Sequence, residues 1–476
     1  MYRSIFLLVF TLLISCQKRI NKIPKSDSLP NIVLIFTDDQ GYQDVGVFGS
    51  PNIRTPHLNK MASEGLKLTN FYAAQAVCSA SRAAILTGCY PNRISIHGAL
   101  MPNAKIGLAH QEVTIAEMLQ QKGYATGIFG KWHLGDHPDY MPLNHGFDEF
   151  FGIPYSNDMW PNHPQQGPIF DFDPLPLYEN EVVIDTLTDQ SNLTTQITQK
   201  SVEFIKRNKD KPFFLYVPHP QPHVPLFVSD KFKGRSERGL YGDVIMEIDW
   251  SVGQIMKTLK DAHIDDNTLV IFTSDNGPWL AYGNHSGSAK PLREGKGTAW
   301  EGGQREPFIA HFPGKIPSGT TLKTPLMAID ILPTLAEMVG ADLPINEIDG
   351  KSAWRLFKGE TEKSPQDVYF FYYKKNELHG VRYGKWKLYF PHSYRTMRGQ
   401  EPGKDGLPGE YKIIGIKEIE LYDLENDISE TKNLALEKPE VVAKIKLLAN
   451  DMRSQLGDAL LELEGSETRL AGQLKE

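Results

Sequence analysis

Short apolar runs that alternate with amphipathic segments constrain the fold of this chain more than any other feature. The first run, in NIVLIFTDD from residue 31, has the continuous apolar character of a strand buried in a parallel sheet. Similar runs lie in YATGIFG, PFFLYVP and NTLVIFTSDNG. Helical patterns lie between or after them, in PHLNKMASEG, TIAEMLQQKG, NLTTQITQKSVEFIKRN, GDVIMEIDWSVGQIMKTLKDA and AIDILPTLAEMVG. This alternation predicts an α/β fold with a large, mostly parallel sheet flanked by helices.

The pattern changes after about residue 360. The segments VYFFYY, HGVRYGKWKLYF and EIELYDLENDI are rich in aromatic residues and predict antiparallel strands, separated by a Gly/Pro-rich loop from Arg398 to Gly409. KPEVVAKIKLLANDMRSQL then predicts an amphipathic helix. We therefore expect a main domain over residues 31–360 and a smaller C-terminal α+β subdomain, an antiparallel sheet plus a helix, over residues 361–476.

The N-terminal segment MYRSIFLLVFTLLISC contains one basic residue and then an apolar run that is too short to span a membrane. Its length is that of a signal-peptide core. The end of the run, LISC, resembles a bacterial lipoprotein box, which implies cleavage before Cys16 and lipid on the Cys16 sulfur. The alternative is an ordinary secretory signal with an incidental cysteine. We expect a signal peptide over residues 1–15 and a lipidated tether over residues 16–30. The lipid would anchor the protein to a membrane of the bacterial cell envelope, on the periplasmic face or the outer-membrane surface.

The net charge of −7 disfavours nucleic acid as a partner, since nucleic-acid-binding surfaces are usually basic overall. An anionic substrate would therefore need a local cluster of cations.

Polar residues follow each of the four apolar runs. In parallel sheets such residues meet at the carboxyl ends of the strands, where ligands bind. A single aspartate in such a place is more often a helix cap or a turn residue, but four polar clusters at four strand ends are harder to explain in that way. The clusters contain Asp38 and Asp39, then Lys131 and His133, then His219 and His223, and finally Asp275 and Asn276.

The types of side chain at these strand ends point to a metal and an anion. Several carboxylates repel one another unless a hard cation lies between them, and an all-oxygen ligand set favours Ca²⁺, with Mg²⁺ second. Further cations are expected nearby from Arg82 and from Lys296 in REGKGTAWEGG. One divalent metal beside several positive side chains suits a dianion or a transferring anionic group.

Cys78 begins a small-residue segment, CSASRAAILTG, that predicts a helix, with Arg82 one turn later. A helix N-terminus attracts anions and lowers the pKa of a thiol. Three interpretations remain open at this point. Cys78 forms a disulfide with Cys89, it acts as a thiolate nucleophile, or it carries an oxygen nucleophile, which would match a hard metal better.

Five motifs in order resemble the type I sulfatases of the alkaline-phosphatase superfamily. CSASR followed by AAILTG resembles the signature whose cysteine is oxidised to formylglycine, and GKWHLG, FTSDNGP and GKGTAWEGGQREP resemble further blocks of that family. FGIPYSND resembles a segment of the arylsulfatase A branch. The resemblance covers residues 31–340 well and the C-terminal part loosely, and it implies an alkaline-phosphatase-like fold.

The resemblance implies roles for individual residues. Cys78 would become formylglycine, whose hydrate would attack sulfur, and Arg82 and Lys131 would hold that hydrate. His133 would deprotonate the hydrate when sulfate is expelled. The sulfate group would be bound by Lys131, Ser156, His223 and Lys296. Ca²⁺ would be bound by Asp38, Asp39, the modified Cys78, Asp275 and Asn276.

The resemblance therefore predicts an exported sulfuric ester hydrolase that acts on a sulfated polysaccharide or oligosaccharide, for example of the algal ulvan or carrageenan type. Its partners would be that carbohydrate, the membrane and a sulfatase-maturing enzyme. Ala80 departs from the commoner signature, which has proline there, and such alanine forms are typical of substrates of radical-SAM maturases. The alternatives are a phosphodiesterase or phosphonate hydrolase of the same superfamily, and a catalytically dead lipoprotein that binds glycans.

Two loops could form sugar subsites, because they combine aromatic and cationic residues. The alternative is ordinary loop packing. These residues are Trp160, His163, His392, Arg395 and Arg398.

Overall fold

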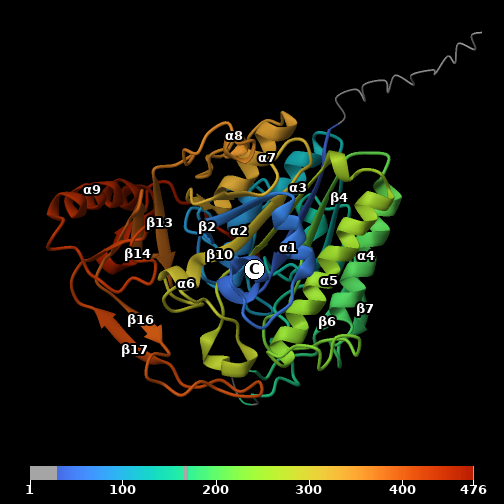
Figure 1. The fold of residues 1–476 in the computed structure, drawn as a ribbon, viewed down its shortest axis with the longest axis horizontal. Helices are drawn as coiled ribbons and strands as arrows, with labels where there is room; N and C mark the ends of the chain where they lie inside the picture. Colours follow the sequence, from blue (N-terminus) through green and yellow to red (C-terminus); the bar gives the residue numbers. More distant parts are fainter. Residues whose placement is uncertain (1–28, 166, 168–169, 475–476) are drawn as a thin grey trace, which may run out of the picture.

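A computed structural model describes residues 29–165, 167 and 170–474 (Figure 1). The expected signal peptide, the lipidated Cys16 and nearly all of the tether lie outside these residues. Within the described part of the chain, every helix is too short or too polar to cross a membrane.

A large mixed sheet forms the centre of the molecule. Its strands run in the order β11-β2-β10-β9-β1-β8-β4-β5-β6-β7, and β12 also pairs with β2. The five central strands β9, β1, β8, β4 and β5 are parallel, which confirms the predicted fold class. The bounds are β1 (Asn31–Thr37), β2 (Leu66–Tyr72), β4 (Ala125–Lys131), β5 (Glu149–Ile153), β6 (Pro176–Glu179), β7 (Val182–Thr186), β8 (Phe213–Pro218), β9 (Thr268–Ser274), β10 (Arg305–His311), β11 (Thr320–Leu322) and β12 (Leu326–Met327).

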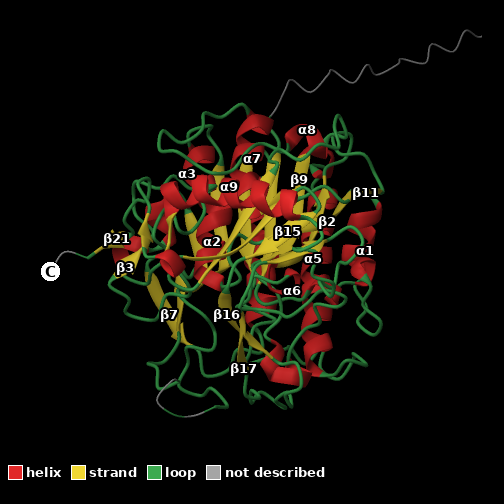
Figure 2. Ribbon diagram, turned by 90° about the vertical axis from the view of Figure 1, so that its left-hand side faces the viewer, coloured by secondary structure: helices red, strands yellow, loops and turns green. Residues whose placement is uncertain are grey.

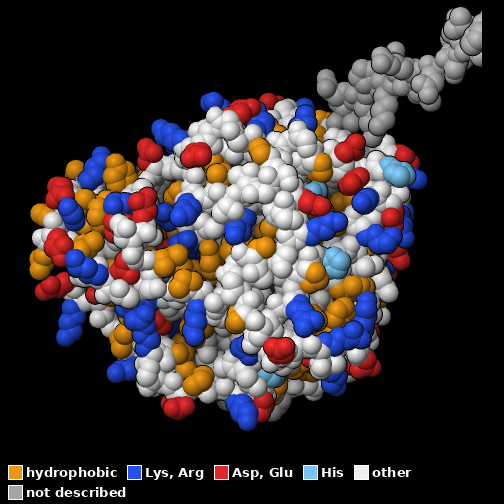
Figure 3. Space-filling view, in the orientation of Figure 1, with side chains coloured by type: hydrophobic (Ala, Val, Ile, Leu, Met, Phe, Trp, Pro, Cys, Tyr) orange, Lys and Arg blue, Asp and Glu red, His pale blue; other side chains and the backbone are white. Residues whose placement is uncertain are grey.

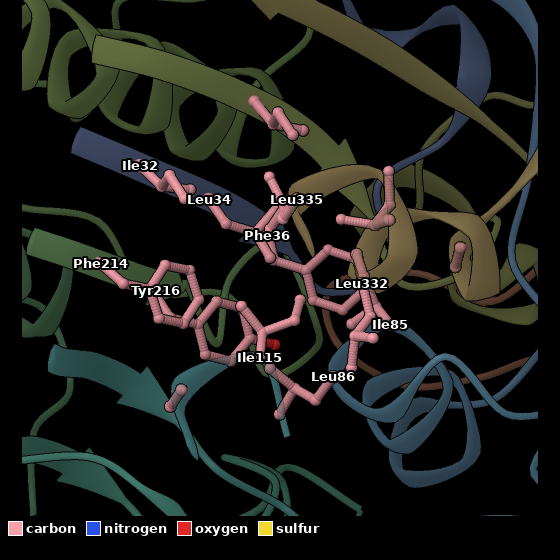
Figure 4. Packing of buried hydrophobic residues seen from close by; sticks show 14 of the residues in the cluster. Ile32, Leu34, Phe36, Ile85, Leu86, Ile115, Phe214, Tyr216, Leu332 and Leu335 are labelled. Atoms are coloured by element: carbon pink, nitrogen blue, oxygen red, sulfur yellow. The ribbon is translucent and has the colours of Figure 1, made fainter. Parts of the chain in front are cut away.

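Helices cover both faces of this sheet. Alternate side chains of β1 point to opposite faces, as the period of a strand requires. Ile32, Leu34 and Phe36 pack on one face against α2 (Cys78–Thr87), α3 (Ile115–Gln120), α7 (Ile331–Val339) and α8 (Trp354–Phe357). Figure 4 shows this layer, with the labelled side chains of β1, α2 and α7 in one cluster.

The opposite face carries three other helices, α1 (Pro56–Ser63), α4 (Leu193–Asn208) and α5 (Leu240–Asp261). Val33 and Ile35 of β1 point into this second layer. Because both faces of the central strands are covered, the middle residues of these strands are mainly apolar, and this explains why four apolar runs could be recognised in the sequence.

The C-terminal part forms a four-stranded antiparallel sheet, β13-β14-β15-β18, with the helix α9 (Figure 2). It shares a core with the main sheet, since Tyr72 and Trp300 belong to the same cluster as Tyr369 and Tyr389. The domain boundary at residue 360 stays a prediction. The bounds are β13 (Val368–Tyr373), β14 (Glu377–Tyr383), β15 (Trp386–Tyr389), β18 (Glu420–Asp423) and α9 (Pro439–Leu456).

Several strands were not expected from the sequence. β2 and β10 extend the sheet on one side as antiparallel neighbours, and β6 and β7 do so on the other. These strands lack a continuous apolar run, because they lie toward the edges of the sheet or carry charged residues. A separate hairpin, β16 (His392–Thr396) and β17 (Lys412–Ile416), flanks the predicted Gly/Pro-rich loop.

Candidate active site

The structure brings the four polar strand ends together. Strands β9, β1, β8 and β4 are adjacent and parallel, so the residues that follow them lie at one edge of the sheet. Thr37 is in register with Ser274, which places Asp38 and Asp39 beside Asp275. The backbone N–H of Asp39 donates to Oδ1 of Asp275 over 3.0 Å.

The carboxylates at this edge are buried and crowded. Asp38, Asp39 and Asp275 are each at most 3% exposed. Burial, together with the neighbouring Asp38 carboxylate, raises the pKa of Asp275 to about 7. For Asp38, burial also acts to raise the pKa, but Lys131 and Arg82 outweigh it and hold the pKa well below its usual value. A set of carboxylates in which one retains a proton near neutral pH is a set that a further cation would stabilise.

Asn276 supplies the observation that tests whether these residues fit a metal ion. Its Nδ2 donates to Oδ1 of Asp39 over 2.7 Å and to the carbonyl of Gly277. Its Oδ1 is buried, and no described residue donates to it. An unpaired amide oxygen beside three carboxylates is the donor set that a hard cation requires, so the residues fit calcium or magnesium.

Ligand atoms of Asp38, Asp39, Cys78 and His223 also lie within 4.8 Å of one another. This second grouping shares three residues with the predicted metal set and adds His223. The nitrogen of His223 suits a hard cation less well than an oxygen does, whereas Asp275 and Asn276 offer oxygen. We therefore favour the predicted oxygen set over the grouping that includes His223.

Arg82 and Lys131 hold the Asp38 carboxylate between them. The Arg82 guanidinium lies 3.3 Å from Oδ2 of Asp38 and 2.9 Å from Oδ2 of Asp275. The ammonium group of Lys131 lies 2.5 Å from Oδ2 of Asp38 and donates to Oγ of Ser156 over 3.0 Å. All of these side chains are buried, so their charges act in a medium where electrostatic interactions are strong.

Cys78 is the first residue of α2 and is 2% exposed. Its Sγ lies 3.6 Å from Oδ1 of Asp38 and 3.5 Å from Nζ of Lys296. Burial raises the pKa of this thiol to about 12, although Lys131 and Lys296 oppose the shift. The expectation of a lowered pKa is therefore wrong, because loss of solvation outweighs the two ammonium groups. The unmodified side chain is a neutral thiol, which argues against a thiolate nucleophile.

The disulfide interpretation of Cys78 is also wrong. Cys78 and Cys89 are both free. They lie at opposite ends of α2, so their Cα atoms are roughly 16 Å apart along the helix, whereas a disulfide needs less than about 7 Å.

Two histidines face this cluster in different ways. His133 donates to the carbonyl of Leu100 through Nε2 over 2.8 Å, and its buried Nδ1 has no partner among the described residues. Burial, with Lys131 and Arg82, lowers its pKa well below the usual value, so the ring is neutral. His223 contacts the carbonyl of Val224 through Nδ1 over 2.6 Å, which leaves Nε2 3.6 Å from Oδ2 of Asp39.

His219 does not join the cluster. Its Nε2 contacts Oγ of Ser251 on α5 over 3.2 Å, and the ring is buried there. Lys296 does join it, with Nζ 2.7 Å from Oδ1 of Asp39. The sequence places Lys296 far from the other residues, and the loop before α6 (Glu301–Gln304) delivers it.

The five residues suggested for sugar subsites differ in their exposure to solvent. Trp160, His163 and His392 are at most 6% exposed, so we correct that interpretation for these three in favour of loop packing. Trp160 donates to the carbonyl of Leu187, and His163 stacks on Phe170. Arg398 is exposed and pairs with Glu294, and Arg395 reaches the backbone of Lys296.

Trp279 was missed from the sequence. It is partly exposed, its ring lies 5.5 Å from that of His223, and Nζ of Lys296 lies 4.6 Å from the centre of its indole. Its position directly after FTSDNGP was the available signal.

Comparison with known proteins agrees with this geometry. The family model Sulfatase matches residues 30–341, and a model of the C-terminal region of aryl-sulfatase matches residues 364–468. Arylsulfatase A from Homo sapiens is 39% identical over 442 residues, which cover 88% of this chain and 87% of the relative. N-acetylgalactosamine-6-sulfatase from Homo sapiens is 38% identical over 412 residues, covering 83% and 77%.

A solved structure described as Ps i-CgsB in complex with k-i-k-neocarrahexaose is also similar. It aligns with a TM-score of 0.73 and 28% identity, covering 90% of this chain and 94% of that one.

Proposed function

This chain belongs to the sulfatase family, in the arylsulfatase A-like branch of the type I enzymes, and is a sulfuric ester hydrolase; we propose that it uses a formylglycine made from Cys78 and a calcium ion to desulfate a carbohydrate. The observation that carries this proposal is the position of Cys78. It opens a helix inside a buried cluster of carboxylates, ammonium groups and imidazoles, and burial leaves its own thiol neutral.

The metal would be held by Asp38, Asp39, Asp275 and Asn276, with the modified side chain of Cys78 beside them. Bound there, calcium would polarise a sulfate oxygen and offset the charge of the carboxylates. The formylglycine would supply an oxygen nucleophile as its hydrate, which suits a hard cation better than sulfur does.

The remaining residues of the cluster bind and orient the sulfate group. Lys296 lies 3.5 Å from the sulfur of Cys78, and Lys131 and Arg82 both pair with the neighbouring Asp38 carboxylate. Ser156 is tied to Lys131 and offers a further polar contact. Such fixed charges in a buried site stabilise an anion more effectively than they would in water.

The two imidazoles suit opposite proton transfers. His133 is neutral with a free Nδ1, so it can accept a proton from the nucleophile. Nδ1 of His223 donates to a backbone carbonyl, and Nε2 lies near Asp39. In its doubly protonated form the ring can therefore deliver the Nε2 proton to the departing sugar oxygen and return to the neutral form.

The proposed substrate is a sulfated polysaccharide or oligosaccharide, of the algal ulvan or carrageenan type. The similar structure that holds neocarrahexaose supports a carrageenan-like ligand. A glycosaminoglycan is the second candidate, and the similarity to N-acetylgalactosamine-6-sulfatase favours it.

The protein would be exported and held in a bacterial envelope by lipid on Cys16, after a maturing enzyme has oxidised Cys78. The sequence patterns at the N-terminus and at Ala80 support these two steps.

The test is release of inorganic sulfate by the matured protein from size-defined carrageenan, ulvan and chondroitin sulfate oligosaccharides, measured by ion chromatography. Matched phosphate esters serve as the comparison. Faster turnover of phosphate than of sulfate would favour the phosphodiesterase alternative, and absence of turnover with binding intact would favour a dead glycan-binding lipoprotein.

A further inference from the structure

A large cavity lies away from the candidate active site. It has a volume of about 1000 Å³ and is formed by α1, the last turns of α5 and the segment that follows β10. In register, His311 at the end of β10 faces Val270 near the start of β9, whereas Asp275 follows the end of β9. Five residues of strand separate these positions, or roughly 16 Å. The cavity therefore opens at the edge of the sheet opposite to the candidate active site.

The rim of this cavity is basic. Its lining includes five lysines and the two carboxylates of Glu64 and Asp265, in a chain whose net charge is −7. Three of the lysines form ion pairs, with Glu64, Asp261 and Glu360. Within the described ranges, Lys260 and Lys315 form no ion pair and leave their charges free for a ligand. Figure 3 shows blue side chains with red ones among them over α1 and α5. The five lysines are Lys60, Lys257, Lys260, Lys315 and Lys358.

One polar side chain in the lining is an imidazole. His311 lines the cavity, and no hydrogen bond joins its ring to another residue in the described part of the chain. Its charged neighbours are Glu64, Asp265 and Lys60, and its ring nitrogens are open to the cavity, where a ligand oxygen could pair with them. The apolar surface of Met61 and Ile316 lies beside it. Apolar contacts of this kind suit the faces of sugar rings.

We propose that this cavity is a second, non-catalytic binding site for a sulfated glycan chain. The lysines would contact sulfate groups, His311 would hydrogen-bond to a sulfate or hydroxyl oxygen, and the apolar floor would contact the sugar. A volume of this size is at the upper end of the range for small-molecule sites and accommodates an oligosaccharide. The choice of a sulfated ligand rests on the proposed function, whereas the basic cavity itself does not. The site would hold a polymer on the enzyme between successive desulfation events.

The test uses Cys78→Ala protein, so that the probe, a carrageenan hexasaccharide, is bound without turnover. Calorimetric titration should give two sites for this protein and one when Lys257, Lys260 and Lys315 are also changed to glutamate. The control changes Lys432, Lys444 and Lys446 to glutamate on the distant C-terminal surface and should keep two sites. His311→Gln should weaken the second site about tenfold, since it alters one buried contact.

In the matured enzyme, which does not carry the Cys78→Ala change, substitution of the three cavity lysines by glutamate should leave hydrolysis of 4-nitrophenyl sulfate unchanged. They should raise KM on polymeric carrageenan about tenfold, because three lysine–sulfate contacts are lost. The proposal is overturned if the triple-lysine variant still binds two hexasaccharides, or if the control variant loses as much binding.

It is also overturned if the three cavity substitutions abolish binding to phosphatidylglycerol vesicles but not to the hexasaccharide, since the cavity would then bind a membrane surface. Failure of the proposed function would instead show as no turnover of any sulfate ester, with hexasaccharide binding unaffected.

Discussion

The guanidinium group of Arg395 donates two hydrogen bonds to the backbone carbonyl of Lys296, over 3.0 and 2.7 Å, although the two residues are 99 positions apart. Arg395 belongs to β16, in the hairpin of the C-terminal part, and also lies over the ring of Tyr411. The C-terminal part thereby fixes the backbone of Lys296, whose ammonium group lies in the candidate active site.

Changing Arg395 to alanine should therefore reduce activity through the position of Lys296. We expect kcat/KM on 4-nitrophenyl sulfate to fall about 10- to 100-fold, because a displacement of about 1 Å in a catalytic site has an effect of this order. The measurement is steady-state kinetics with thermal unfolding as the companion. Arg398→Ala, which removes an exposed neighbour, is the matched control and should retain near-normal rates.

Changing His223 to alanine should affect sugar and aryl substrates unequally. A sugar hydroxyl is a poor leaving group and needs a proton, whereas a nitrophenolate does not. General acid catalysis contributes about 10²- to 10⁴-fold, so kcat/KM on a sugar sulfate should fall by that factor while the aryl sulfate retains much of its rate. Equal losses on both would identify His223 as a sulfate-binding residue, and the acid would then be sought at Lys296.

Cys78 should be formylglycine in active protein produced with a suitable maturase. Mass spectrometry of the peptide that contains residues 78–82 is the measurement, and oxidation of the thiol to the aldehyde lowers its mass. Fully active protein with an unmodified Cys78 thiol would contradict the prediction. Cys89 serves as the internal control, because it is buried behind α2 and should stay a thiol.

Removal of the metal should abolish activity and lower the melting temperature. Calcium that binds only the folded state raises stability with its concentration. Asn276→Ala removes the unpaired Oδ1, so a calcium titration followed by thermal unfolding should give at least about tenfold weaker binding. Asp266→Asn changes an exposed carboxylate and should titrate like the unchanged protein. Full activity after exhaustive chelation, with no metal detected by elemental analysis, would contradict the calcium assignment.

Glu430 should make stability depend on pH. Burial, together with the neighbouring Glu301, raises its pKa from about 4.5 to about 7, against the opposing effect of Lys387. The folded protein therefore binds this proton more tightly than the unfolded chain does. The resulting stability is complete below about pH 4.5 and is lost as pH rises through about 7.

Glu430→Gln should remove this dependence, which is on the order of 1–3 kcal/mol. The measurement is the free energy of unfolding in denaturant between pH 5 and 8, with the exposed Glu425→Gln as control. Equal slopes for both variants and the unchanged protein would show that Glu430 does not titrate in this range.

The central strands and their polar ends could be predicted because burial on both faces leaves a local signature. Residues 32–36 are apolar throughout, and the chain must place Asp38 and Asp39 at the sheet edge where each neighbouring parallel strand also ends. That argument needs only the order of runs along the chain. The edge strands β2 and β10 could not be found in this way, since their partners are set by pairing between segments more than 200 residues apart.

The sequence by itself determined the residue types of the catalytic cluster, because metal and anion binding need particular groups, and these follow strands that are recognisable locally. Only the tertiary structure decided their charge states and partners. The Cys78 thiol is neutral because packing around α2 excludes water, and no local pattern reports that loss of solvation. In the same way, Arg395 reaches Lys296, and His311 lines one cavity together with five lysines, because segments distant in the chain meet there. Contacts of this kind depend on the whole fold, so they leave no signature in a short stretch of sequence.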